Sequence, residues 1–596
     1  MSDVQIRVSA ARATGALPHF WQSTGFTPAS LLLGEPMQQL CQYLGSIPHG
    51  GVTHVRIHYL LELVRGSRFD TQRPDYDWSL LDRGLDVLVE SRLKPFFELM
   101  GNPGGYFDNF EADVQVRAWR RLVRDLALRC MDRYGQDEVR SWYFETWNEP
   151  DVGWWTQSDR AFHNYYDACS AGLADADRRL LMGGPGTCRT LSDRFKSFIA
   201  HCDRGRDYFT GRKGVRLDYI SIHEKGQHSH KEDLDPDMQG VCRREGRIME
   251  WVRRYHPRLG TLPFMNNECD PPVGWLELHT WHGKAYYAAI VAKAIGQHLG
   301  CLVDEKQIHY ALLSNDNGFL GTWGQRTHLA LFGTGEQQAL GRFEQIKKPA
   351  HNVMTMLALL GDQRLAVTPG GGAFDDLGVI ATKRGKDQVA VLIFNVADRI
   401  MSSGKCDVRL QIDGLGDGPW TLVHYAIRDG VGDPYAVWHT SAVSPERVSG
   451  SHAELSARMR QEQELRAIEG PTGADVQAGT LACRIALPLP SVSLLVLSRK
   501  PAGGPKVVTG LKARRYHGLT GQAQVMLTWR PAESRVIHTY EVLHAPSRRG
   551  PWKRINQPDL LCGAYLHVAE DVRGFYAIRA VDLWGRQGRA SRAIEV

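Results

Sequence analysis

The stretch FETWNEPD, residues 144–151, holds the pattern that decides the fold. Apolar and β-favouring residues lead into Glu149, and the proline that follows it stops a strand and turns the chain. A second stretch, NNECDPP at residues 266–272, has the same order, with Glu268 after a short strand-like run and prolines shortly beyond. Both stretches therefore predict a strand that presents a glutamate where it ends.

Eight strand-like runs, these two stretches included, alternate with amphipathic segments along the first part of the chain. In residues 114–133, apolar side chains return every three or four positions, as on one face of a helix. This alternation predicts an α/β fold, a (β/α)8 TIM barrel, with its active site at the carboxyl ends of the strands. Glu149 would end the fourth strand and Glu268 the seventh, so both would point at the barrel mouth. The predicted strands are residues 19–28, 52–60, 94–100, 139–149, 180–185, 217–223, 262–270 and 308–317.

The pattern changes after residue 365. Strand-like runs separated by Gly and Pro follow one another without alternating helices, which is typical of a β-sandwich. We assign residues 10–365 to the barrel and residues 366–500 to the sandwich. Residues 1–9 are expected to add a strand to the sandwich, and residues 453–468 an inserted helix.

A Gly- and Pro-rich linker precedes the last part of the chain, residues 505–596. Trp529 lies on an early strand-like run, and a Tyr-x-Ile-x-Ala pattern occupies residues 576–580. Both features are typical of a fibronectin type III-like β domain.

Composition narrows the class of protein. A chain of 596 residues with 43% hydrophobic and 23% charged residues has the composition of a globular protein of several domains. It has no apolar run long enough to span a membrane, no secretory signal and no Asn-x-Ser/Thr site, and its 11 cysteines are an odd number without metal-ligand spacing. We therefore expect a cytoplasmic protein with no membrane partner. The net charge of +6 slightly favours an anionic ligand but does not indicate nucleic acid.

Two carboxylates at strand ends of a large barrel are the equipment of a glycoside hydrolase. One protonates the leaving oxygen, and the other attacks the anomeric carbon or activates water. Glu149 would have to be protonated and Glu268 ionised, and the negative charge of Glu268 would raise the pKa of Glu149. A retaining mechanism predicts carboxyl groups about 5–5.5 Å apart.

Several longer strings carry a family resemblance: FWQSTGF at 20–26, VRIHYLLELV at 55–64, FELMG at 97–101, LDYISIH at 217–223 and YALLSNDN at 310–317. With FETWNEPD and the domain order, they make the chain resemble the α-L-iduronidases, in the glycoside hydrolase group that also holds retaining β-xylosidases. The resemblance implies Glu149 as the general acid/base and Glu268 as the nucleophile. It also implies that a sugar pocket is lined by His58, Asn148, Lys225, Gly274, Asp316 and Arg326.

Lys225 and Arg326 bear on the substrate. An α-L-iduronide without its C5 carboxylate is stereochemically a β-D-xyloside, so a preference for the uronate needs added cations. We expect the partner to be an anionic oligosaccharide, a glycosaminoglycan fragment ending in α-L-iduronic acid. His58 and His223, at predicted strand ends, either orient sugar hydroxyls or are ordinary core histidines.

No cofactor and no metal is expected, since the histidines at 228 and 230 lack ligand spacing. Two alternatives stay open: a related β-xylosidase or other uronide or pentoside hydrolase, and a catalytically inactive carbohydrate-binding protein. The chain departs from the animal enzymes in a shorter stretch between residues 316 and 326, which changes the mouth of the pocket. It also has Leu497 and Val536 where the animal enzymes have a disulfide.

Overall fold

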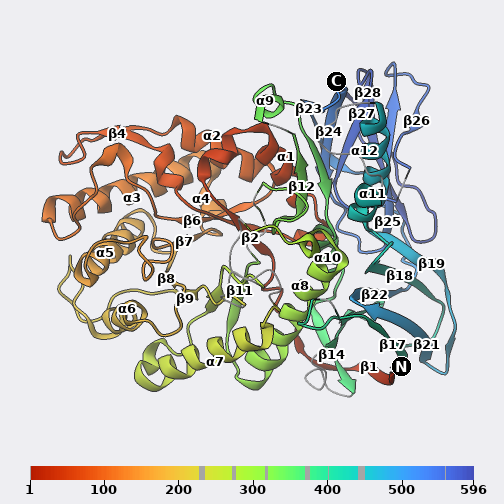
Figure 1. Cartoon of the computed structure of the whole chain (residues 1–596), viewed down its shortest axis with the longest axis horizontal. Coiled ribbons are helices and arrows are strands. Elements are labelled where there is room, and N and C mark those ends of the chain that lie inside the picture. The colour runs from red at the N-terminus through yellow and green to blue at the C-terminus, as the bar shows by residue number, and fades with distance from the viewer. Residues whose placement is uncertain are drawn as a thin grey trace.

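The computed structural model describes residues 2–226, 235–271, 277–315, 318, 320–333, 335–368, 376–400, 402–440, 450–557 and 559–596. A barrel carries a β-sandwich on one side, and a smaller β domain sits beside the sandwich at the C-terminal end (Figure 1). In the described part of the chain, no helix is long and apolar enough to cross a membrane.

The barrel is an eight-stranded parallel sheet. A parallel bridge between Ser23 and Ser314 joins the first strand to the last and closes the sheet. Each strand coincides with one predicted from the sequence, so the (β/α)8 prediction is confirmed. In chain order the strands are β2 (Ser23–Phe26), β3 (His54–Ile57), β6 (Lys94–Glu98), β7 (Tyr143–Glu145), β8 (Leu181–Thr187), β9 (Tyr219–Ile222), β10 (Phe264–Asn266) and β11 (Tyr310–Leu313).

Amphipathic helices cover the outside of the barrel. Helix α3 buries Trp119, Leu122 and Leu126 on one stripe, the three-to-four spacing that the sequence predicted. It ends at Gly135, whose φ of 89° is open to glycine and strained for other residues. The helices that follow the strands are α1 (Glu35–Leu44), α2 (Ser79–Glu90), α3 (Asp113–Tyr134), α5 (Asp159–Ala176), α6 (Asp193–Arg204), α7 (Met238–Tyr255), α8 (Ala285–Gln297) and α10 (Pro349–Ala358).

The sandwich is one ten-stranded sheet that folds over a shared apolar core. Its interior strand β1 pairs in parallel with β17 and antiparallel with β14. The core brings Ile6 of β1 together with Val391 of β16 and Leu497 of β22. The strands are β1 (Ser2–Ala16), β14 (Gln363–Thr368), β15 (Leu377–Arg384), β16 (Gln388–Asn395), β17 (Gly404–Asp413), β18 (Trp420–Arg428), β19 (Arg466–Ala474), β20 (Val476–Gln477), β21 (Thr480–Leu489) and β22 (Ser491–Ser498).

The sequence predicted the inserted helix of the sandwich too far along the chain. The inserted helix predicted for 453–468 is α12 (Gly450–Glu462), and residues 466–468 already belong to β19. Antiparallel pairing with β18 overrides the local helix propensity there. The run 481–498 is two strands, β21 and β22, on either side of Pro490, because proline cannot supply a ladder hydrogen bond.

The C-terminal domain packs a three-stranded sheet against a four-stranded one. Trp529 and Tyr540 lie buried between the sheets with Tyr576 and Ile578, as the fibronectin-like pattern predicted. The strands are β23 (Thr509–His517), β24 (Ala523–Arg530), β25 (Ile537–Ala545), β26 (Lys553–Arg554), β27 (Ala564–Ala569), β28 (Phe575–Asp582) and β29 (Ile594–Glu595).

Helix α8 joins barrel and sandwich (Figure 1). Every residue from Ala285 to Ile295 is buried, since the helix contacts the barrel on one side and β22 and β15 on the other. A helix with no polar face is expected between two cores. Its Lys293 donates a hydrogen bond to the Val396 carbonyl (3.2 Å) and forms an ion pair with Asp398 (3.1 Å), which fixes the sandwich against the barrel.

Candidate active site at the barrel mouth

Arg56, near the end of β3, is the centre of a buried charge cluster. Its guanidinium donates from Nε to Glu145 (2.7 Å) and from Nη1 to Glu268 (2.7 Å), and Nη2 contacts Glu98 and the Asn148 amide oxygen (3.1 Å for Asn148). Arg56 is 1% exposed. The planar fork of an arginine can serve several carboxylates at fixed angles, so the position of Glu268 is set by a rigid donor.

Glu268 follows β10 by two residues and is almost fully buried. Its Oε1 accepts from Arg56 and lies 3.4 Å from His58 Nε2, while its Oε2 accepts from Lys225 at 2.6 Å. The preceding Asn267 donates to Glu145 at 2.7 Å. Both oxygens are therefore held before any ligand binds.

Glu149 sits on a strained turn after β7. Its φ is 42°, a left-handed conformation that is costly for a residue with a side chain, and its N–H donates to Gly186 of β8 at 3.0 Å. The carboxylate Oε1 lies 3.0 Å from His223 Nδ1 and 3.1 Å from Lys225 Nζ. Oxygens of Glu149 and Glu268 and a ring nitrogen of His223 all lie within 4.8 Å of one another.

The pKa directions follow from this geometry. Burial alone would raise the pKa of Glu149, but Lys225 and His223 lower it to about 2. Burial opposes ionisation of Glu268 too, yet His223, Lys225, His58 and Arg56 bring its pKa well below the ordinary value. The surrounding cations thus favour the ionised form of both glutamates. The expectation that Glu268 raises the pKa of Glu149 is outweighed by Lys225, whose ammonium is shared by the two carboxylates.

Neighbouring charges also shift the pKa of His58, but upward. Burial alone would lower the pKa of His58, but the carboxylates of Glu98 and Glu268 raise it to about 10. Its Nδ1 lies 2.5 Å from Glu98 Oε2. His58 is therefore an imidazolium wedged between two carboxylates.

The structure brings most of the predicted site residues together. His58, Asn148, His223 and Lys225 all contact the glutamate pair or Arg56. Arg326, 3% exposed, contacts Asp270, two residues beyond Glu268. Gly274 and Asp316 lie outside the described residues, as do residues 228 and 230.

Sequence reasoning missed the framework of this site: Arg56, Glu98, Glu145, Asn267 and Asp270. Three of these residues could have been identified from the sequence. Arg56, Glu98 and Glu145 are charged residues inside or at the end of otherwise apolar strands, and a charge is rarely buried there without a partner.

Two sets of three side chains have metal-ligand spacing among the described residues. In the first, Glu149, His223 and Glu268, the Lys225 ammonium already supplies a cation between the carboxylates. In the second, Glu245, Cys269 and His298, the glutamate pairs with His298 at 3.2 Å and accepts from Asn266 at 2.6 Å. In each set, the carboxylates are thus already engaged by groups of the protein.

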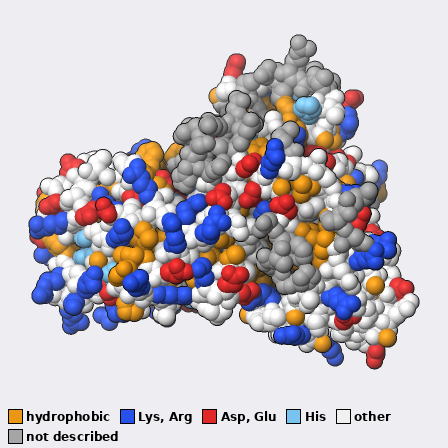
Figure 2. Space-filling view, turned by 60° about the horizontal axis from the view of Figure 1, so that its bottom comes forward, with side chains coloured by type: hydrophobic (Ala, Val, Ile, Leu, Met, Phe, Trp, Pro, Cys, Tyr) orange, Lys and Arg blue, Asp and Glu red, His pale blue; other side chains and the backbone are white. Residues whose placement is uncertain are grey.

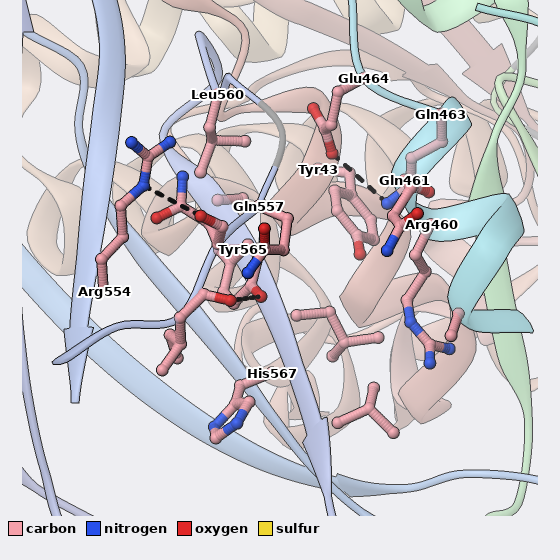
Figure 3. A pocket seen from close by; sticks show the side chains of 16 residues that line it. Tyr43, Arg460, Gln461, Gln463, Glu464, Arg554, Gln557, Leu560, Tyr565 and His567 are labelled. Atoms are coloured by element: carbon pink, nitrogen blue, oxygen red, sulfur yellow. Dashed lines mark hydrogen bonds between the residues drawn. The ribbon is translucent and has the colours of Figure 1, made fainter. Parts of the chain in front are cut away.

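A polar cavity, which we call the seam cavity, lies where barrel, sandwich insertion and C-terminal domain meet. It measures about 380 Å³ and is lined by Tyr43 of α1, Arg460 and Glu464 around the end of α12, and Arg554 and Tyr565 of the last domain (Figure 3). Its charged groups are matched within the protein: Glu464 accepts twice from Lys347 at 2.8 Å, and Arg460 donates to Glu344 at 3.0 Å. It therefore lacks the shared charges of the barrel mouth.

Charges of both signs mix on the face drawn in Figure 2, where Lys and Arg are interspersed with Asp and Glu. This face therefore shows no single basic patch that would attract an anionic ligand.

Comparison with known proteins agrees with this geometry. The family model "Glycosyl hydrolases family 39" matches residues 4–464. The chain belongs to glycosyl hydrolase family 39. The family 39 chain is therefore a glycosidase. Its residues 515–596 match the "Alpha-L-iduronidase C-terminal domain" model.

Relatives of this family 39 chain cover its whole length. It is 34% identical to the α-L-iduronidase of Mus musculus, over 98% of this chain and 94% of the relative. The α-L-iduronidase of Homo sapiens is 34% identical, over 98% of this chain and 92% of the relative. A solved structure of a bacterial orthologue of human α-L-iduronidase is 38% identical, with a TM-score of 0.93 and full coverage of both chains.

Proposed function

We propose that this glycosidase removes terminal α-L-iduronic acid from glycosaminoglycan-derived saccharides with retention of configuration. Glu149 is the acid/base and Glu268 the nucleophile. The observation that carries the proposal is the Lys225 ammonium, 2.6 Å from Glu268 and 3.1 Å from Glu149. One oxygen of each glutamate lies within 4.8 Å of the other, which supports the close carboxyl pair of a retaining enzyme over the wider pair of an inverting one, at about 6.5–9.5 Å.

Substrate binding prepares the two glutamates for their roles in the reaction. A C5 carboxylate entering the pocket attracts Lys225 away from Glu149 and Glu268. Without the ammonium, burial and the charge of Glu268 raise the pKa of Glu149, so it takes up a proton. The same movement releases Oε2 of Glu268, while Arg56 keeps Oε1 in place. One displacement thus prepares both the acid and the nucleophile.

The reaction then proceeds in two steps. Glu149 gives its proton to the glycosidic oxygen as the C1–O bond breaks, and Glu268 Oε2 bonds to C1. In the second step Glu149 takes a proton from water, the water oxygen bonds to C1, and the ester to Glu268 breaks. Asn148, whose oxygen is held by Arg56, has its NH₂ left to donate to the sugar 2-hydroxyl.

Arg326 supplies the second cation for the uronate. Its Nε has no hydrogen-bond partner among the described residues, although the side chain is buried beside Asp270. A buried guanidinium nitrogen without a partner is a strong donor for an entering carboxylate. Lys225 and Arg326 together would favour an iduronide over the xyloside that lacks this group.

A panel of aryl glycosides tests the proposal. We expect the largest kcat/KM on the α-L-iduronide, and weaker or no turnover on the β-D-glucuronide, β-D-xyloside and α-L-arabinoside. NMR of the first-formed sugar should give the retained anomer. A preference for the xyloside would overturn the substrate assignment and leave the glutamate roles intact, whereas an inverted product would overturn the roles.

A further inference from the structure

Lys348 is a fully buried lysine between β13 (Glu344–Lys347) and α10. Its Nζ lies 2.7 Å from the Thr322 carbonyl, 3.2 Å from that of Trp323, 2.8 Å from that of Gln325 and 2.6 Å from the Thr327 hydroxyl. The Thr327 hydroxyl donates to the Leu329 carbonyl, so it is free to accept from Lys348. Four oxygens converge on one amine.

These oxygens belong to a single loop, residues 322–327, which carries Arg326. Lys348 serves three of its carbonyls, and the Gly324 carbonyl accepts from His282 Nδ1 at 2.7 Å and from the His279 N–H at 2.8 Å. Buried carbonyls that converge without donors are costly. The shape of this loop therefore depends on Lys348 and its neighbours.

The position of Lys348 is unfavourable for a residue that only stabilises the fold. No carboxylate among the described residues appears with it in an ion pair, and it stands at the N-terminus of α10, where the helix dipole opposes a cation. Burial lowers the pKa of Lys348 well below its ordinary value. The geometry nevertheless suits a charged amine, because the lone pair of a neutral amine would face one of the four oxygens.

The neighbouring Lys347 is the contrast. It is equally buried, but it forms a two-point ion pair with Glu464 at 2.8 Å beside the seam cavity. Two consecutive buried lysines thus bind different partners: Lys347 an insertion carboxylate, and Lys348 the oxygens of a barrel loop.

We propose that Lys348 is a positioning residue for substrate recognition: it holds the loop 322–327 so that the Arg326 guanidinium faces the substrate carboxylate. This proposal rests on the function proposed above for Arg326. Lys348 acts through the loop and not on the substrate, since the four hydrogen bonds of its Nζ among the described residues all go to residues 322–327.

The test compares Lys348→Met with Arg326→Leu and with the matched control Lys347→Met, each on an aryl α-L-iduronide and an aryl β-D-xyloside. We expect Lys348→Met to lower kcat/KM on the iduronide about 10-fold to 100-fold more than on the xyloside, mainly through KM, because small misplacements of a binding group have effects of this size. Lys347→Met should lower thermal stability but leave the ratio of the two substrates unchanged.

Thr327→Val removes one acceptor and keeps the side-chain volume. It should lower the ratio of kcat/KM on the iduronide to kcat/KM on the xyloside by a smaller factor than Lys348→Met. This variant replaces Lys348→Met in the test if that variant does not fold. If the xyloside is cleaved too slowly, inhibition constants for free L-iduronate and D-xylose give the same comparison. A selective loss in Arg326→Leu with none in Lys348→Met and Thr327→Val would overturn the positioning role. No selective loss in Arg326→Leu would instead overturn the proposed role of Arg326 itself.

Discussion

The barrel mouth and the seam cavity are both buried, polar and rich in ions, but they distribute charge differently. At the seam, Lys347 pairs with Glu464, and Arg460 pairs with Glu344. At the mouth, Lys225 lies within ion-pair distance of three carboxylates, and Arg56 also contacts three. The seam is an arrangement of matched pairs, and the mouth is one of shared partners.

The difference explains why only the mouth can respond to a ligand. A matched pair gains little from an entering charge, because both partners are already satisfied. A shared cation can be drawn to one side, and the group it leaves changes its proton affinity.

Removal of the nucleophile should produce the largest effect. Glu268→Gln leaves no oxygen that can bond to C1, so turnover should fall on the order of 10⁵-fold or more on every substrate. Steady-state rates on the aryl iduronide and xyloside measure this loss. Residual activity near the wild-type level would contradict the nucleophile assignment.

Glu149→Gln should be less damaging and should depend on the leaving group. Acid assistance typically contributes ~10²–10⁴-fold, and an activated aryl leaving group needs little of it. The rate should therefore fall steeply on a natural disaccharide and modestly on a dinitrophenyl glycoside. Added azide should restore part of the rate as a glycosyl azide. Equal losses with no rescue would argue against the acid/base role.

Lys225→Met tests the shared cation directly. It should cost the iduronide about 30-fold to several thousand-fold in kcat/KM, as for other broken buried charge pairs at ~2–5 kcal/mol, and cost the xyloside far less. It should also raise the pKa of Glu149, which Lys225 now lowers to about 2. A higher pKa keeps the acid protonated to higher pH, so the alkaline limb of the xyloside profile should move upward. A profile unchanged in Lys225→Met would refute this coupling.

The seam should show the opposite behaviour. Glu464→Gln leaves the Lys347 ammonium buried without its carboxylate, which typically costs about 3–5 kcal/mol of stability. The melting temperature should fall while kcat and KM of the folded enzyme stay unchanged. Calorimetry measures the melting temperature, and kinetics below the unfolding transition measure kcat and KM. A large change in kcat would contradict the proposed difference between the seam cavity and the barrel mouth.

Much of the architecture could be predicted because periodicity reports on it directly. The eight strands and the two glutamates at their ends come from local patterns such as residues 144–151. The charge network could not be predicted in this way. Arg56 reaches Glu268 only because barrel closure brings β3 and β10 together, over 212 residues of sequence.

The low pKa of Glu149 was missed for the same reason. Its partner Lys225 comes from another strand end, 76 residues further along the chain. The boundary of α12 failed for a related cause: residues 466–468 are helix formers locally but pair with β18 in the sheet. Local signals predicted elements well and predicted long-range electrostatic partners poorly.

Strand β1 has a consequence for biosynthesis. Its parallel partner β17 lies about 400 residues further along the chain, so at ~5–20 residues per second the ribosome needs tens of seconds to produce it. The antiparallel partner β14 emerges only slightly earlier. Throughout that interval Ile6 and Val8, which end up fully buried, have no sheet to enter. Strand β1 therefore has no partner strand while the barrel is translated. Its unpaired edges can pair with other chains and promote aggregation until the sandwich forms.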